Sequence, residues 1–146
     1  MSGYEIRPAL EAESGQIRGL IDLVGINPMG LDWRRFIVAV ESGRVVACGQ
    51  VKPHGADIRE LASIAVHPEY RGRRLARSVI ETLLGRHPRP LYLMCMSHNG
   101  AMYEKFGFRR LPTGQMPRYF ARVKNLFDVS KVFRRVEGDL LVMKLE

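Results

Sequence analysis

The 146-residue sequence predicts an α/β (α+β) fold, with a mixed central sheet of about six to seven strands flanked by helices in three layers. An apolar run at Ile58–Val66 is followed by a helical pattern and then by a second apolar run at Leu91–Met96, and strands joined by such a crossover lie parallel. Earlier in the chain, Phe36–Val40 and Arg44–Lys52 flank a short turn with a glycine, which is typical of an antiparallel hairpin. The sheet should therefore be antiparallel in its first half and parallel at its centre.

The other elements follow from the same kinds of pattern. Apolar residues at spacings of three and four, from Ile17 to Val24, predict an amphipathic helix that Gly25 closes. A second helical pattern predicts an additional basic helix over about residues 118–135. The remaining predicted elements are a strand at Tyr4–Arg7, a loop at Ile26–Trp33, a short helix from Ser97 to Phe106 capped by Ser97 or Asn99, a strand at Phe108–Leu111, a loop at Pro112–Pro117 and a strand at Leu140–Leu145.

The composition indicates a single folded domain over residues 1–146. Hydrophobic residues make up 46% of the chain, which suffices for one core and is too much for a disordered chain. The apolar runs are far shorter than a membrane span, and the charged N-terminus lacks the apolar core of a signal peptide, so no membrane partner is expected. Cys48 and Cys95 lie in separate apolar runs without a CxxC motif, which predicts buried free thiols and a cytoplasmic protein. The histidines are scattered without metal-ligand spacing, so no metal is expected.

Positive charge is concentrated in one segment of the chain. The net charge is +8, from 23 basic and 15 acidic residues, and Arg109–Arg135 alone holds eight basic residues against Asp128. A basic surface attracts CoA, nucleic acid, an acidic protein or acidic lipid equally well. Aromatic residues interleave with these cations, which is compatible with nucleic acid, but their spacing is also that of a helix face turned toward a core. They are Tyr119, Phe120, Phe127 and Phe133.

Four arginines crowd the start of the helix that follows the central strand. His67-Pro68 ends the strand, because the residue before proline is kept away from helical angles, and the helix is predicted to begin near Arg73. The helix dipole disfavours cations at this end, so a bound anion such as a di- or triphosphate would explain the cluster. The alternative is a solvated basic first turn. The cluster consists of Arg71, Arg73, Arg74 and Arg77.

Two motifs resemble those of the GNAT superfamily of N-acetyltransferases. Val66–Ala76 (VHPEYRGRRLA) is similar to the acetyl-CoA loop of that family, whose signature is Gln or Arg, two residues, Gly, one residue, then Gly or Ala. Arg71 and Ala76 match the ends of the signature, whereas Arg74 stands where the signature has glycine. Ala101–Phe108 (AMYEKFGF) resembles the second signature of the family, closely over its last six residues. Because the order of elements also agrees, the resemblance extends over most of the chain and implies a GNAT-like fold.

The resemblance implies direct transfer of an acetyl group from acetyl-CoA to a primary amine of a small molecule, peptide or protein. In the family, the loop amides hold the pyrophosphate, and the central strand splays from the next strand so that the pantetheine bonds its exposed backbone. The cofactor-binding residues implied in this way are Ile64, Ala65 and Val66 on the strand, Arg71, Gly72, Arg73, Arg74, Leu75 and Ala76 in the loop, and Asn99.

The same resemblance implies two catalytic residues. Tyr103 matches the tyrosine that protonates the leaving thiolate, with a half-buried structural tyrosine as the alternative. Glu60 lies near the start of the central strand, where some family members carry a glutamate that takes the amine proton. The alternative for Glu60 is an exposed strand residue or a partner of Arg59. His98 and His67 are lesser candidates for the base.

Several questions stay open at the level of sequence. The acceptor amine is undefined, although Trp33 is a candidate contact to it as well as a candidate packing anchor. The acyl chain could be longer than acetyl, and the protein could form a homodimer. The competing function class is a module that binds CoA or nucleic acid without catalysis, which the basic segment and the altered position at Arg74 would suit.

Overall fold

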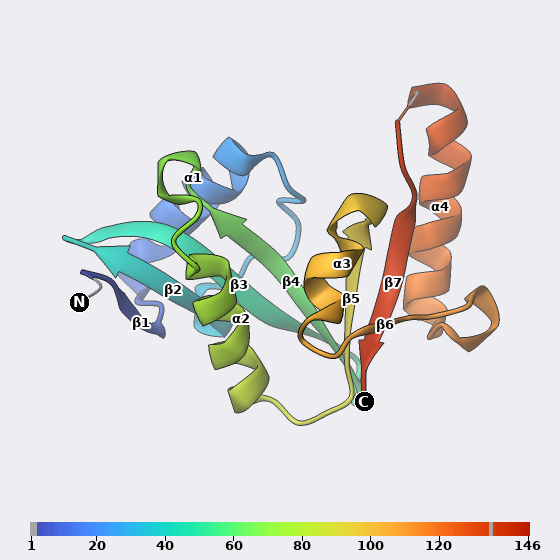
Figure 1. Cartoon of the computed structure of the whole chain (residues 1–146), viewed down its shortest axis with the longest axis horizontal. Coiled ribbons are helices and arrows are strands. Elements are labelled where there is room, and N and C mark those ends of the chain that lie inside the picture. The colour runs from blue at the N-terminus through green and yellow to red at the C-terminus, as the bar shows by residue number, and fades with distance from the viewer. Residues whose placement is uncertain (1–2, 135) are drawn as a thin grey trace. The chain divides into compact units, whose positions relative to one another are not determined.

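The structure is a computed structural model that describes residues 3–134 and 136–146 (Figure 1). Its strands, in their order across the sheet, are β1 (Glu5–Pro8), β2 (Phe36–Glu41), β3 (Arg44–His54), β4 (Ile58–Val66), β5 (Leu91–Met96), β7 (Leu140–Leu145) and β6 (Arg109–Arg110). Its α-helices are α1 (Ser14–Val24), α2 (Leu75–Arg86), α3 (Gly100–Glu104) and α4 (Arg118–Arg134). Within the described residues the sheet is mixed, antiparallel in its first half and parallel at β4–β5, so the predicted fold class is confirmed.

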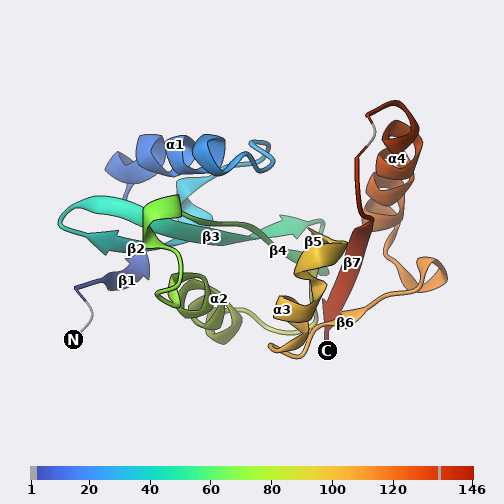
Figure 2. The same cartoon turned by 45° about the horizontal axis from the view of Figure 1, so that its top comes forward.

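The chain divides into two compact units, and the first holds the N-terminal half of the sheet. Unit 1 comprises the residues up to Lys52 and Leu61–Pro88. Helices α1 and α2 cover opposite faces of its strands (Figure 2). Gly25, with φ +81°, ends α1 as predicted, and its amide donates to the carbonyl of Ile21. The core on the α1 side is made of buried residues from the helix and from β2 and β3, including Ile17, Leu20, Ile21, Phe36, Val38, Val40 and Cys48.

On the opposite face, α2 approaches the sheet closely at Gly49 in β3. A Cβ atom at this position would lie 2.5 Å from Ile64 Cδ1 and 2.9 Å from Val79 Cγ1, which is closer than side chains approach each other. Glycine is therefore required for β3, β4 and α2 to pack at this distance. The predicted apolar stripe of α2 fills the same interface, since Val79, Ile80 and Leu83 are at most 1% exposed.

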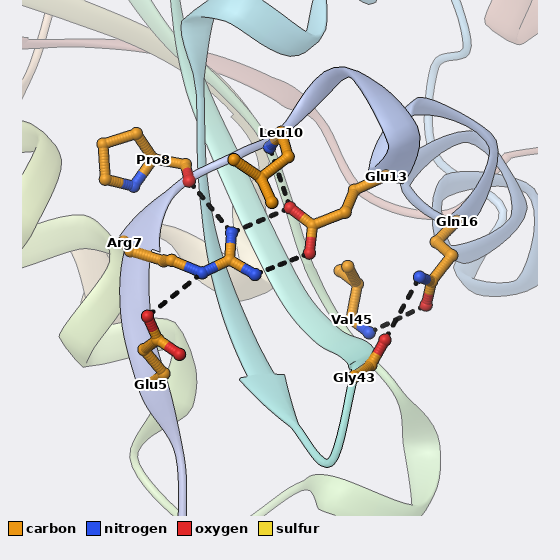
Figure 3. A network of polar contacts seen from close by, with 8 residues as sticks. All are labelled: Glu5, Arg7, Pro8, Leu10, Glu13, Gln16, Gly43 and Val45. Carbon is orange, nitrogen blue, oxygen red and sulfur yellow. Dashed lines mark hydrogen bonds and ion pairs between the residues drawn. The ribbon is translucent and has the colours of Figure 1, made fainter.

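Polar contacts join β1, α1 and the β2–β3 hairpin (Figure 3). The Arg7 guanidinium donates two hydrogen bonds to the Glu13 carboxylate, at 2.8 and 2.7 Å, and the Leu10 amide donates a third at 2.8 Å. Glu13 is only 6% exposed, so this charge is removed from water and depends on its partners. In α1, Gln16 accepts a hydrogen bond from the Val45 amide at 2.9 Å, which fixes the helix against the hairpin.

Unit 2 holds the C-terminal half of the sheet. It comprises Pro53–Glu60 and the described residues of Arg89–Glu146. β5 pairs with β7 along its whole length, and the two-residue strand β6 pairs with the other edge of β7. Helix α4 lies along β7 (Figures 1 and 2). The core beneath α4 contains Tyr92, Leu111, Phe120 and Val142. The single domain expected from composition stays a prediction.

Two strands extend to a proline just beyond their predicted ends, Arg7 and Lys52. β3 continues to His54, whereas the predicted strand ends at Lys52, directly before Pro53. The first residue of β2, Phe36, pairs with Gln50, so Pro53 lies beyond the end of β2. Pro53 has no N–H to donate, but no residue of β2 lies opposite it to accept a hydrogen bond. Pro8 likewise is the last residue of β1, which is an edge strand of the sheet.

The start of α2 differs from the prediction. The helix begins at Leu75 rather than near Arg73. Gly72 and Arg74 have φ values of +79° and +60°, and this left-handed backbone cannot form part of a right-handed helix. The strand before it, β4, has the predicted bounds.

Helix α3 is shorter than predicted and is capped differently. It begins at Gly100, after a 3₁₀ turn, and ends at Glu104 rather than at Phe106. The predicted cap is wrong, because Asn99 makes no side-chain cap bond. The Ser97 hydroxyl instead accepts a hydrogen bond from the Asp139 amide at 3.1 Å. β6 is also shorter than the predicted strand at 108–111.

Helix α4 has the predicted start and an unexpected outer face. Phe120 is fully buried against the sheet, but Phe133 is 83% exposed, so the prediction that all four aromatic residues occupy core positions is wrong. Only the stripe facing β7 is covered. The large hydrophobic residues exposed on the helix are Tyr119, Leu126, Val129, Val132 and Phe133. Arg135, the predicted last residue of the helix, lies outside the described residues.

Two predictions from composition can be compared with the structure. Cys48 and Cys95 are free and buried, as predicted, and burial raises the pKa of their thiols to about 12 and about 11. In the described residues, none of the helices combines the length and the hydropathy that crossing a bilayer requires.

Candidate functional site

In unit 1, the turn between β4 and α2 presents backbone amides at a helix N-terminus. A 3₁₀ turn at Pro68–Tyr70 leads into the two left-handed residues Gly72 and Arg74. The first bond of α2 runs from the Ser78 amide to the Arg74 carbonyl at 3.0 Å, so the amides of the three residues between them have no partner within the helix. The Arg74 side chain does not cap them. Together with the helix dipole, these donors form an anion-binding end.

The conformation of Arg74 explains why glycine is expected at this position. The left-handed region costs a residue with a Cβ atom roughly 1–2 kcal/mol of conformational free energy, whereas glycine adopts it without this steric cost. Here the turn keeps its left-handed geometry with arginine, at φ +60° and ψ +24°. The departure from the family signature therefore leaves the path of the backbone intact and adds an exposed cation beside the amides.

The four arginines of the cluster fall into two pairs. Arg77 forms an ion pair of 2.7 Å with a glutamate one turn later in α2, and the Arg73 guanidinium lies 4.9 Å from the centroid of the Tyr70 ring. Arg71 and Arg74 make no hydrogen bond or ion pair with the described residues. These two guanidinium groups are therefore available to an anion at the start of α2.

β4 bends directly before the predicted cofactor-binding segment Ile64–Val66. Ser63 has φ +59°, and its hydroxyl accepts a hydrogen bond from Gln50 Nε2 at 2.9 Å. A residue outside the extended region interrupts the regular ladder of a sheet, as a bulge does. The backbone groups after such a bend can be offered to a ligand, which is what the expected role of this segment requires. Within the segment, Ala65 is 2% exposed and its neighbours are half-buried.

In unit 2, the carboxylate of Glu60 is buried and paired. The residue is 4% exposed, and Glu60 Oε1 lies 2.7 Å from Nε2 of His54. The bond joins the end of β3 to the start of β4. Both structural alternatives for Glu60 are therefore wrong: the residue is not exposed, and in the described residues it forms no ion pair with Arg59.

His54 is held by two aromatic rings from α4. The Tyr119 ring stacks on the imidazole with centroids 3.9 Å apart and planes 22° apart. The Phe120 ring meets it edge-on at 6.0 Å and 81°. Sequence analysis missed His54, because the predicted strand ended at Lys52 and left His54 in a loop. The signal that could have found it is its place beside Glu60 across the β3–β4 hairpin.

Tyr103 lies in α3 with a protonated hydroxyl. Burial, and secondarily the nearby Cys95 thiol, raises the pKa of its phenol to about 12. Its ring packs edge-on against Phe108 at 6.2 Å, and its hydroxyl has no hydrogen-bond partner in the described part of the chain. The group can therefore donate a hydrogen bond to an incoming atom at neutral pH.

The other polar residues singled out from the sequence differ in their surroundings. Asn99 and His98 are exposed in the 3₁₀ turn before α3. The His67 ring accepts a hydrogen bond from the Glu69 amide at 3.1 Å and lies 3.0 Å from an Arg44 nitrogen, so it organises the loop after β4. No group of three or more His, Cys, Asp or Glu side chains in the described ranges is placed to hold a metal ion.

A cleft of about 410 Å³ opens in unit 1 beside Trp33. Trp33 is half-buried, packs against the core on the α1 side and also lines the cleft, so the two roles considered for it are compatible. The polar part of the lining is supplied by Ser14, Arg18, Asp32 and Arg34.

Comparison with known proteins identifies the family. A family model described as "Acetyltransferase (GNAT) domain" matches residues 32–110, which is more than half of the chain and includes the β4–α2 turn, Glu60 and Tyr103. The chain belongs to the GNAT acetyltransferase family. No curated protein matches this chain in a sequence search.

Solved structures share the fold of this GNAT chain at low sequence identity. The Mycobacterium tuberculosis protein Rv2747, in complex with CoA, is 20% identical with a TM-score of 0.73, and the match covers 97% of this chain and 98% of that one. The Escherichia coli ribosomal-protein-S18-alanine N-acetyltransferase is 18% identical with a TM-score of 0.68, covering 97% and 92%. N-acetylglutamate synthase from Neisseria gonorrhoeae, complexed with coenzyme A and L-arginine, is 17% identical with a TM-score of 0.70. The match covers 98% of this chain but only 33% of the synthase.

Proposed function

We propose that this GNAT acetyltransferase transfers the acetyl group of acetyl-CoA directly to a primary amine. The observation that carries the proposal is the left-handed turn before α2, with its unpaired amides and the unpartnered cations of Arg71 and Arg74. The diphosphate of CoA has the charge and the acceptor oxygens that such a turn binds. The CoA complexes of Rv2747 and of the Neisseria synthase, which have the same fold, support this choice of donor.

Two segments of unit 1 would hold the donor. The amides from Arg71 to Ala76 bind the diphosphate, and the backbone of Ile64–Val66, after the bend at Ser63, bonds the pantetheine. The two available arginines add charge-assisted hydrogen bonds to the phosphates. Asn99, which is exposed and does not cap α3, remains a proposed contact to the donor.

The reaction requires one proton to leave the acceptor and one sulfur to leave the donor. The amine nitrogen attacks the thioester carbonyl carbon, a C–N bond forms, the C–S bond breaks, and the nitrogen loses a proton. Glu60 and its partner His54 supply the basic group for that proton. Holding both reactants together supplies much of the rate, because it turns a bimolecular step into one within a complex.

Tyr103 is the proposed donor to the leaving sulfur. A phenol with a pKa of about 12 is a weaker acid than a free thiol, whose pKa is roughly 8.5, so complete proton transfer to the thiolate would be uphill by about 5 kcal/mol. The hydroxyl therefore stabilises the departing sulfur by a hydrogen bond, and the thiolate is protonated from solvent. This role requires only that the phenol stay protonated, which its raised pKa ensures.

Calorimetry and a thiol-release assay test the proposal together. Acetyl-CoA should bind, and CoA should be released with at least one member of a panel of amino acids, peptides with free N-termini, polyamines and small primary amines. Arg71→Ala should weaken CoA binding by about 10-fold, from the loss of a hydrogen bond between charged groups. Arg86→Ala, at the opposite end of α2, is the matched control and should leave binding unchanged. Binding without turnover across the panel would favour the non-catalytic CoA-binding alternative.

A further inference from the structure

We infer that His54 is the group that takes the proton from the acceptor amine, and that Glu60 is its positioning residue. The inference rests on the proposed function and refines it, because the family resemblance points to Glu60 alone. It is carried by the contacts of the two side chains with each other and with α4.

The direction of the hydrogen bond fixes which nitrogen of His54 can act as a base. An ionised carboxylate only accepts hydrogen bonds, so the 2.7 Å contact to Glu60 Oε1 places the hydrogen of His54 on Nε2. In a neutral imidazole the other nitrogen then carries the free lone pair. That nitrogen, Nδ1, makes no hydrogen bond with the described residues. The dyad therefore presents one unoccupied basic atom, and it belongs to His54.

Access also favours His54 over Glu60. The side chain of His54 is 19% exposed, whereas that of Glu60 is 6% exposed and already uses one oxygen for the imidazole. An amine, or a water molecule that relays its proton, would therefore reach the ring before it reached the carboxylate. Glu60 can still act through the ring, by holding its tautomer and by stabilising the imidazolium that forms.

The rings of α4 fix the direction in which Nδ1 points. Tyr119 covers one face of the imidazole and Phe120 meets its edge, so rotation of the ring would break the stack and the bond to Glu60 together. Among the described residues, the titratable groups in contact with His54 are Glu60 from β4 and Tyr119 from α4. Burial and the charge of Glu60 raise the pKa of the Tyr119 phenol, so it stays neutral and the carboxylate is the charge that acts on the ring.

In the proposed step, the amine nitrogen gives its proton to His54 Nδ1 as its electron pair forms the C–N bond. The electrons of the C–S bond leave with the sulfur. The resulting imidazolium remains hydrogen-bonded through Nε2 to the Glu60 carboxylate, and it returns its proton to solvent before the next turnover. Every proton and electron pair is accounted for by the donor, the acceptor and water.

Three variants of the full chain separate the roles, measured as kcat/KM against pH at saturating acetyl-CoA. His54→Gln keeps an N–H that can reach Glu60 but has no basic nitrogen, so it should lower kcat/KM for the amine by about 100-fold or more. It should also abolish the acidic limb, which is the part of the fall in kcat/KM at low pH that comes from protonation of the base. Glu60→Gln should cause a smaller loss, because the imidazole keeps its basic nitrogen but loses the carboxylate that holds its tautomer and orientation. Arg86→Ala, at the C-terminal end of α2, changes none of the groups assigned to the reaction and is the control, expected to retain both the rate and the limb.

The outcomes that would overturn the inference are equally specific. If His54→Gln retains the rate and the limb while Glu60→Gln loses them, Glu60 is the base itself. If His98→Gln abolishes the limb instead, the base is the exposed histidine before α3. A wild-type chain that acetylates no amine would overturn the proposed function, and the base assignment with it.

A measurement independent of turnover tests the positioning by Glu60. In a ¹⁵N–¹H spectrum of the histidine-labelled chain, neutral His54 should be the tautomer protonated on Nε2, with slow exchange of that proton. The preference should weaken in Glu60→Gln. A His54 protonated on Nδ1 would leave no free base on the open side of the ring and would overturn the inference, whatever the activity of the chain.

Discussion

Replacing Arg74 by glycine should stabilise this fold, although the change removes a large side chain. Arg74 has φ +60° and ψ +24°, and its side chain makes no hydrogen bond or ion pair with the described residues. Left-handed backbone costs a residue with a Cβ atom roughly 1–2 kcal/mol. Glycine avoids that cost but loses about 0.5–1 kcal/mol more conformational entropy on folding. The difference leaves Arg74→Gly more stable than the wild type by about 0.5 kcal/mol.

A comparison of glycine with alanine isolates the backbone from the lost side chain. Arg74→Ala removes the same charge but keeps the Cβ atom, so it should also be about 0.5 kcal/mol less stable than Arg74→Gly. Arg77 provides the control, because it lies within α2 and has ordinary helical geometry. There the order should reverse, with Arg77→Ala more stable than Arg77→Gly by about 0.5–1 kcal/mol.

Urea unfolding of the four variants measures these differences directly, and thermal unfolding should show Arg74→Gly shifted upward by about 1–2 °C. The reasoning would be refuted if alanine equalled or exceeded glycine in stability at position 74. That result would mean that the turn before α2 is not left-handed in solution. It would also remove the basis for the amide-lined anion site, because an extended residue at this position would direct the following amides elsewhere.

Three further outcomes are expected. Phe120→Ala should destabilise the fold by about 3–5 kcal/mol and Phe133→Ala by less than about 0.5 kcal/mol in urea unfolding, since the first ring is fully buried and the second is 83% exposed on the same helix. The Arg7 hydrogen bonds lower the pKa of Glu13 below its ordinary value of 4.5, so their stabilisation is present above that pH and is lost as the pH falls through the folded-state pKa. The stability gap between the wild type and Glu13→Gln should therefore be full at pH 6 and close progressively below about pH 4.5, as stability curves measured across this range would show. Tyr103→Phe should lower kcat by about 10- to 100-fold while leaving the affinity for CoA unchanged in calorimetry, and an equal loss of affinity would contradict its role at the leaving sulfur.

The sequence predicted those elements whose pattern is local. β4, β5 and β7 have the predicted bounds, because each is a mostly apolar run with turn or loop residues beside it in the sequence. The β2–β3 hairpin and the end of α1 were predicted for a similar reason, since the glycines at 25 and 43 adopt the positive φ values that their positions require. In these places the short-range preferences of the chain agree with the final fold, and no distant contact is needed to explain them.

The structure differs from the prediction where contacts with a distant part of the chain determine the local structure. Pro53 does not end β3, because β2 has already stopped pairing beside it, and that register cannot be derived from the proline itself. The outer face of α4 has the same apolar spacing as its inner face, so the sequence pattern could not show that β7 covers only one of them. The left-handed turn at Arg74 was not predicted for a different reason. Glycine at this position would have indicated a positive φ, whereas arginine rarely adopts one.

The same distinction separates the anion-binding turn of unit 1 from the proposed base in unit 2. The anion-binding turn is encoded in one continuous stretch, so its motif is recognisable in the sequence even with arginine at its glycine position. The proposed base is not continuous: Glu60 acquires its partner through the β3–β4 hairpin, and His54 acquires its fixed orientation from two rings of α4. Burying the Glu60 carboxylate costs free energy, and its hydrogen bond with His54 offsets that cost only if the imidazole is held in place. The Tyr119 ring stacked on His54 helps to hold it there. For this chain, α4 is therefore part of the proposed chemistry, and Tyr119→Ala, which removes the stacked ring, should lower kcat/KM for the amine even though the donor still binds.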